Sequence, residues 1–91
     1  MKIELNNQFK SFAGEDFKGL TMGQMLAEAL GQGNKGNSIK LYSWALKFYN
    51  KEAVEMDDTD FDVLKGLVET TEVLNNLFKA QLLLEFEKLK K

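Results

Sequence analysis

The sequence predicts a mostly helical α+β protein, in which an N-terminal β-hairpin packs against about four helices. Residues 2–12 largely alternate polar and apolar side chains, which is the two-residue period of a half-buried strand. After Thr21, most apolar residues recur instead with the spacing of one helix face. A chain of 91 residues has room for one hydrophobic core, so residues 1–91 are expected to form a single domain.

The hairpin is expected over residues 2–20. Residues 13–16, with the sequence A-G-E-D, supply turn residues after the first strand, and residues 17–20 can return as the second strand. Because an isolated hairpin is marginally stable in water, helices must cover it.

Thr21 marks the start of the first helix, expected over residues 22–30. Gln24 follows three residues later and completes a capping box with Thr21, and Gly31 is expected to end the helix. Residues 32–37 are predicted to form a loop.

The second helix is expected over residues 38–50. Its apolar residues leave only a narrow polar stripe, so we expect burial on more than one side. These apolar residues are Leu41, Tyr42, Trp44, Ala45, Leu46, Phe48 and Tyr49. Residues 52–56 alternate again and are a candidate third strand for the hairpin.

The third helix is expected over residues 58–70. Acidic residues at its start are stabilised by the partial positive charge at the N-terminal end of a helix. A fourth helix is expected over residues 71–90. Leu82, Leu83 and Leu84 make its middle apolar nearly all round. This helix is therefore either central in the fold or in contact with a partner protein.

The composition argues against most enzyme classes. The chain has no Cys, His or Arg, and therefore no Ser-His or Cys-His nucleophile pair, no ordinary zinc site and no guanidinium group for phosphate. We expect a protein that is not an enzyme and needs no cofactor or metal. A net charge of −2 makes nucleic acid an unlikely partner.

The N-terminus lacks the apolar core of a secretory signal, and no apolar run approaches the length of a membrane-spanning helix. A cytoplasmic protein without membrane contact is expected.

Residues 31–36 read G-Q-G-N-K-G, which matches the spacing of a dinucleotide-binding loop. A dinucleotide-binding loop requires a preceding strand. In this chain a predicted helix precedes residues 31–36, so a loop between two helices is the better interpretation. Gly33, Lys35 and Lys40 remain candidates for binding an anion at the start of the second helix.

The acidic segment 52–62 allows two interpretations. Asp58, Asp60, Asp62 and Glu69 have the spacing of calcium-loop ligands, but Val63 occupies the position that requires glycine. Helix capping and a solvated face are therefore expected, and an acidic docking surface is the alternative. That surface would contain Asp57, Asp58 and Asp60.

Aromatic and basic residues are interleaved in the second helix. Tyr42, Trp44 and Phe48 cannot all point one way on a helix, so at least part of the group must be core, and burial of the whole group is the favoured interpretation. Any exposed ring would serve protein contact before nucleotide stacking. The candidate partner-binding residues are Tyr42, Trp44, Lys47 and Tyr49 in this helix and Leu83 in the last helix.

The layout resembles a group of small proteins of tailed phages and prophages. The resemblance rests on the hairpin, L-T-M-G-Q-M-L at 20–26, W-A-L-K-F-Y at 44–49, the acid-capped helix around 60–68 and K-A-Q-L-L at 79–83. It covers nearly the whole chain and implies a protein made in the cytoplasm of an infected or lysogenic bacterium, where it acts by binding.

We therefore expect a phage or prophage protein that binds another protein and forms a homo-oligomer. The partner would be a host factor, such as a defence component, or a virion-assembly protein. The alternative is a small-molecule or nucleotide-signal sponge that holds its ligand between subunits.

Overall fold

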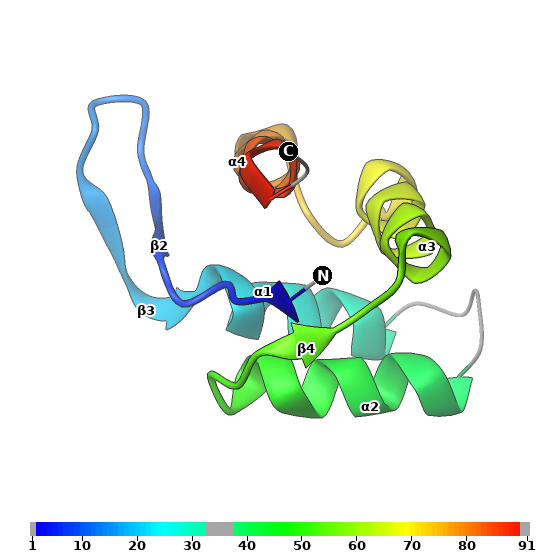
Figure 1. Ribbon diagram of the computed structural model, residues 1–91. Coiled ribbons are helices and arrows are strands. Elements are labelled where there is room, and N and C mark those ends of the chain that lie inside the picture. The colour runs from blue at the N-terminus through cyan, green and yellow to red at the C-terminus, as the bar shows by residue number, and fades with distance from the viewer. Residues whose placement is uncertain (1, 33–37, 90–91) are drawn as a thin grey trace.

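The computed structural model describes residues 2–32 and 38–89 and confirms the α+β class (Figure 1). In chain order the elements are β1 (Lys2–Ile3), β2 (Gln8–Lys10), β3 (Asp16–Thr21), α1 (Met22–Gln32), α2 (Ser38–Tyr49), β4 (Val54–Glu55), α3 (Asp58–Thr70) and α4 (Asn76–Leu89). Within the described residues, helices form most of the fold and the strands are short.

The strands form two separate antiparallel pairs, which differs from the single hairpin system expected. β2 pairs with β3, whereas β1 pairs with β4 in a register that places Ile3 opposite Val54. The strand expected near residues 52–56 therefore exists but joins β1 instead of the hairpin. The reason is burial, because Ile3 and Val54 are both almost fully buried in the core.

In Figure 1 the β2–β3 hairpin extends from the start of α1 and lies beside α4. Its turn is closed by a hydrogen bond from the Gly14 amide to the Ser11 carbonyl oxygen, and Gly14 has a φ of 88°. A side chain at Gly14 would be strained in this conformation, which explains glycine at the turn.

α1 begins with the predicted capping box. The Thr21 hydroxyl accepts from the Gln24 amide at 3.2 Å, and the Gln24 side-chain carbonyl accepts from the Thr21 amide at 3.0 Å. The helix continues to Gln32, two residues beyond the expected end at residue 30, so Gly31 lies inside its last turn.

α3 has the predicted bounds, and the Asp57 carboxylate caps it by accepting from the Asp60 amide at 2.7 Å. α4 begins at Asn76 and not at residue 71, which corrects the expected boundary. Thr71 has extended backbone angles that end α3, and the Asn75 side chain accepts from the Phe78 amide as the cap of α4.

One cluster of buried side chains joins all four described helices with β1, β2 and β4. α2 lies along one edge of the molecule in Figure 1, with β1, β4 and α1 between it and the pair formed by α3 and α4. This arrangement leaves the outer face of α2 uncovered.

Candidate functional site

The outer face of α2 carries four large apolar side chains that are exposed. The exposed fractions are 83% for Ile39, 66% for Tyr42, and 45% for both Leu46 and Tyr49. Their spacing of three, four and three residues places them in one row along the helix, as in the seam of a coiled coil. We call these four residues the α2 stripe.

The opposite face of α2 enters the core through Leu41, Trp44 and Phe48. The helix is therefore apolar on two sides, but only one of them is buried. This corrects the expectation that burial on several sides explains the apolar sequence of the helix.

Trp44 belongs to the buried face, with 6% of its surface exposed, and is not part of an accessible binding surface. The ammonium group of Lys40 lies 5.9 Å from the centre of the Trp44 ring and 2.8 Å from an Asp60 carboxylate oxygen. The hydrogen bond to Asp60, followed by the charge of Asp60, raises the pKa of Lys40 above its ordinary value. The ion pair of Lys40 with Asp60 thus connects α2 to α3.

The three acidic residues predicted to bind a partner have different surroundings. Asp57 caps α3 and Asp60 pairs with Lys40, so both carboxylates have structural contacts. Asp58 is exposed in the first turn of α3, where its charge is favoured by the helix dipole. The structure therefore supports the capping interpretation of this segment.

The remaining candidates lie apart from one another. Lys47 is exposed on α2 but directly follows Leu46 and so lies outside the row of the α2 stripe, and Leu83 on α4 is partly buried against the core. The neighbouring Leu84 has 57% of its surface exposed and is the more accessible leucine. Gly33 and Lys35 lie outside the described residues.

Two members of the α2 stripe, Ile39 and Leu46, were not among the residues predicted to bind a partner. The spacing of three and four residues between Ile39, Tyr42, Leu46 and Tyr49 is readable in the sequence. What the sequence lacked was any indication of which of the two apolar rows of α2 faces solvent.

Within residues 2–32 and 38–89, no three acidic side chains gather in a group able to hold a metal ion. In the same part of the chain, no helix combines the length and apolar character needed to cross a membrane.

No family model, curated protein or solved structure matches this chain. Its architecture defines a small α+β protein, and the described residues include an uncovered apolar face on α2.

Proposed function

We propose that this chain is a non-enzymatic binding protein that docks a partner protein on the α2 stripe. The observation that carries the proposal is the row of Ile39, Tyr42, Leu46 and Tyr49, all exposed on one helix face. Single exposed apolar residues are ordinary on protein surfaces, whereas a continuous patch of them is typical of an interaction surface.

The stripe has the dimensions of a helix-recognition surface. From Ile39 to Tyr49 the stripe covers ten residue steps, or about 15 Å of helix axis. Apolar residues spaced by three and four positions are the anchors by which an amphipathic helix enters an apolar groove or pairs with another helix. Tyrosine, which supplies two of the four members, is enriched among residues that dominate binding energy.

The partner we propose is a protein of the host or of the phage, in keeping with the phage resemblance and a cytoplasmic location. If the protein forms a homo-oligomer, its copies associate through the same α2 stripe. The nucleotide-sponge alternative has less support, because Lys40, one of its proposed cations, is engaged by Asp60.

The test compares Leu46→Asp with Val63→Asp. Leu46 and Val63 are both 45% exposed, but Val63 lies on α3 outside the stripe, so it is a matched control. We expect Leu46→Asp to weaken binding by about tenfold or more, because it places a charge in the middle of the contact. Val63→Asp should leave binding unchanged.

The measurement is native mass spectrometry of each protein purified from its own host, followed by sedimentation equilibrium for any homo-oligomer. A complex or oligomer lost in Leu46→Asp and kept in Val63→Asp supports the proposal. Assembly that survives Leu46→Asp, or a wild-type protein that stays a bare monomer in both measurements, contradicts it.

A further inference from the structure

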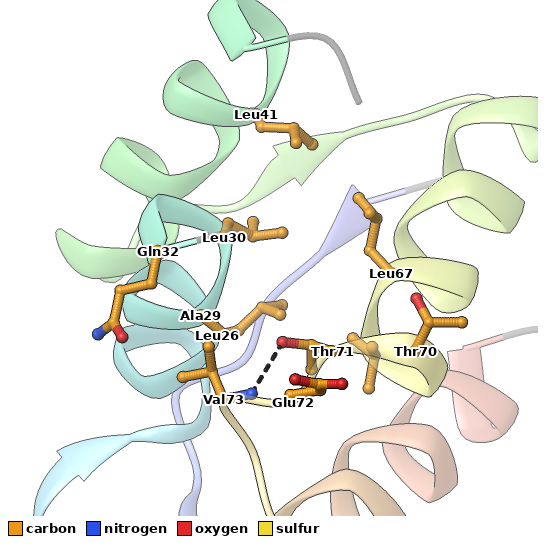
Figure 2. Close-up of a pocket in the computed structure, with 11 residues that line it drawn as sticks. Leu26, Ala29, Leu30, Gln32, Leu41, Leu67, Thr70, Thr71, Glu72 and Val73 are labelled. Carbon is orange, nitrogen blue, oxygen red and sulfur yellow. Dashed lines mark hydrogen bonds between the residues drawn. The ribbon is translucent and has the colours of Figure 1, made fainter. Parts of the chain in front are cut away.

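A cavity of about 370 Å³ lies between α1, α2 and the C-terminal end of α3 (Figure 2). Its walls are mainly apolar and come largely from three helices. The apolar lining residues of the helices are Leu26, Ala29 and Leu30 from α1, Leu41 from α2, and Leu67 and Val68 from α3. This cavity is separate from the α2 stripe, because Leu41 belongs to the buried face of α2.

The cavity is partly open to solvent, so it is a surface pocket and not an internal void. An enclosed apolar cavity of about 150 Å³ is large enough to bind benzene, and this pocket offers a larger but partly open space. Its volume lies within the range of natural small-molecule sites, about 300–1,000 Å³.

The mouth of the cavity is mostly polar and contains one acidic residue. It is formed by Gln32, Thr70, Thr71, Glu72 and Val73, of which Glu72 is exposed and bears the only formal charge among the described lining residues. The Thr70 hydroxyl donates to the Gly66 carbonyl oxygen at 2.9 Å, and Thr71 Oγ1 accepts from the Val73 amide at 3.2 Å (Figure 2).

Helix polarity adds to the charge of Glu72. α1 ends at Gln32 and α3 ends at Thr70, both beside the mouth, and neither helix has a basic residue in its last turn. Helix C-termini carry partial negative charge, which attracts cations and repels anions. Lys79 on α4 donates to the Glu69 carbonyl oxygen at 3.3 Å, which offsets part of this charge at the end of α3, although Lys79 does not line the cavity.

We propose that the cavity binds a small apolar molecule with a protonated amine head group. The apolar body fills the space among Leu30, Leu41 and Leu67, and the amine lies at the mouth beside Glu72. An anionic ligand such as a nucleotide is disfavoured, because its phosphates would meet this carboxylate and the helix C-termini.

The test uses three probes with the same eight-carbon chain and different head groups: octylammonium, 1-octanol and octanoate. Each is titrated below its micelle concentration into the isotopically labelled protein, and NMR shifts of the Leu30, Leu41 and Leu67 methyl groups are followed. Octylammonium should bind most tightly and octanoate least tightly. The proposal is overturned if no probe moves these methyl groups or if octanoate binds most tightly.

Two substitutions test the head-group site and the apolar cavity independently. Glu72→Lys changes an exposed residue and should shift the affinity ratio of octylammonium to octanoate by about tenfold toward octanoate. An unchanged ratio would overturn the assignment of Glu72.

Ala29→Phe fills the cavity and should abolish binding of all three probes, whereas Ala80→Phe on the exposed side of α4 should not. Probe binding that persists in a folded Ala29→Phe variant overturns the location. If that variant does not fold, the Glu72→Lys titration still decides the proposal.

Discussion

At the residue scale, Gly23 controls how closely α1 approaches two other segments. A Cβ atom at this position would lie 2.9 Å from the Leu5 carbonyl oxygen and 3.0 Å from the Phe48 carbonyl oxygen. Both are backbone atoms and cannot rotate away. The Gly23 amide also donates to the Leu5 carbonyl oxygen at 2.7 Å, so the close approach is itself hydrogen-bonded.

Gly23→Ala should therefore destabilise the protein by about 1–3 kcal/mol, because the added methyl group forces the backbone apart. The control is Gly66→Ala in the middle of α3, where a Cβ would meet nothing within 4 Å. That change should stabilise the protein by about 0.5–1 kcal/mol through helix propensity. Urea denaturation measures both, and equal effects of the two substitutions would contradict this account.

Residue-level features differ in how far the sequence predicts them. The Thr21 and Gln24 capping box was predictable because the two residues are three positions apart and interact within one helical turn. The requirement for glycine at 23 was not, because it depends on Leu5 and Phe48, which tertiary packing brings to α1.

At the element scale, Gln81 attaches α4 to the edge of the hairpin. Its side-chain carbonyl accepts from the Lys10 amide at 2.8 Å, and its side-chain NH₂ donates to the Lys10 carbonyl oxygen at 2.7 Å. The side chain thus satisfies the same two groups that another strand would satisfy. The Phe78 ring also meets the Phe9 ring at a tilt and the Phe17 ring edge to face, which supports the same contact between α4 and the hairpin.

Gln81→Glu should destabilise the protein by about 1 kcal/mol near neutral pH, because the ionised carboxylate cannot donate to the Lys10 carbonyl oxygen. A protonated carboxyl group can donate, so folding raises the pKa of the introduced group. The loss of stability is therefore fully present above that raised pKa, shrinks as the pH falls from it toward the ordinary glutamate pKa of about 4.3, and should be absent below that value.

Urea denaturation at pH 7 and pH 3.5 measures this change. Glu87→Gln, at an exposed position of the same helix, changes the charge by one unit in the opposite direction without touching the hairpin and should have little effect. A stability difference for Gln81→Glu that does not depend on pH would argue against the paired contact.

At the scale of the whole molecule, one core holds together elements that are remote in the sequence. The rings of Phe61 on α3 and Phe86 on α4 meet edge to face with centroids 5.4 Å apart, and both are almost fully buried. The same helix α4 exposes Leu84, so its two sides should respond differently to truncation.

Phe86→Ala should cost about 3–5 kcal/mol, because it removes ring contacts and leaves a cavity. Leu84→Ala should change stability by less than about 0.5 kcal/mol, because that side chain is largely solvated already. Thermal denaturation followed by circular dichroism distinguishes the two, and a similar loss from both would mean that α4 packs in another orientation.

The sequence alone determined the fold class, the start of α1, the bounds of α3 and the absence of Cys, His and Arg chemistry. These properties depend on composition or on interactions within a few residues, so one sequence contains them. The pairing of β1 with β4, the burial of Trp44 and the exposure of the α2 stripe were decided by tertiary structure. Both faces of α2 are apolar and have the same helical period, and only packing against the rest of the core determines which face is covered.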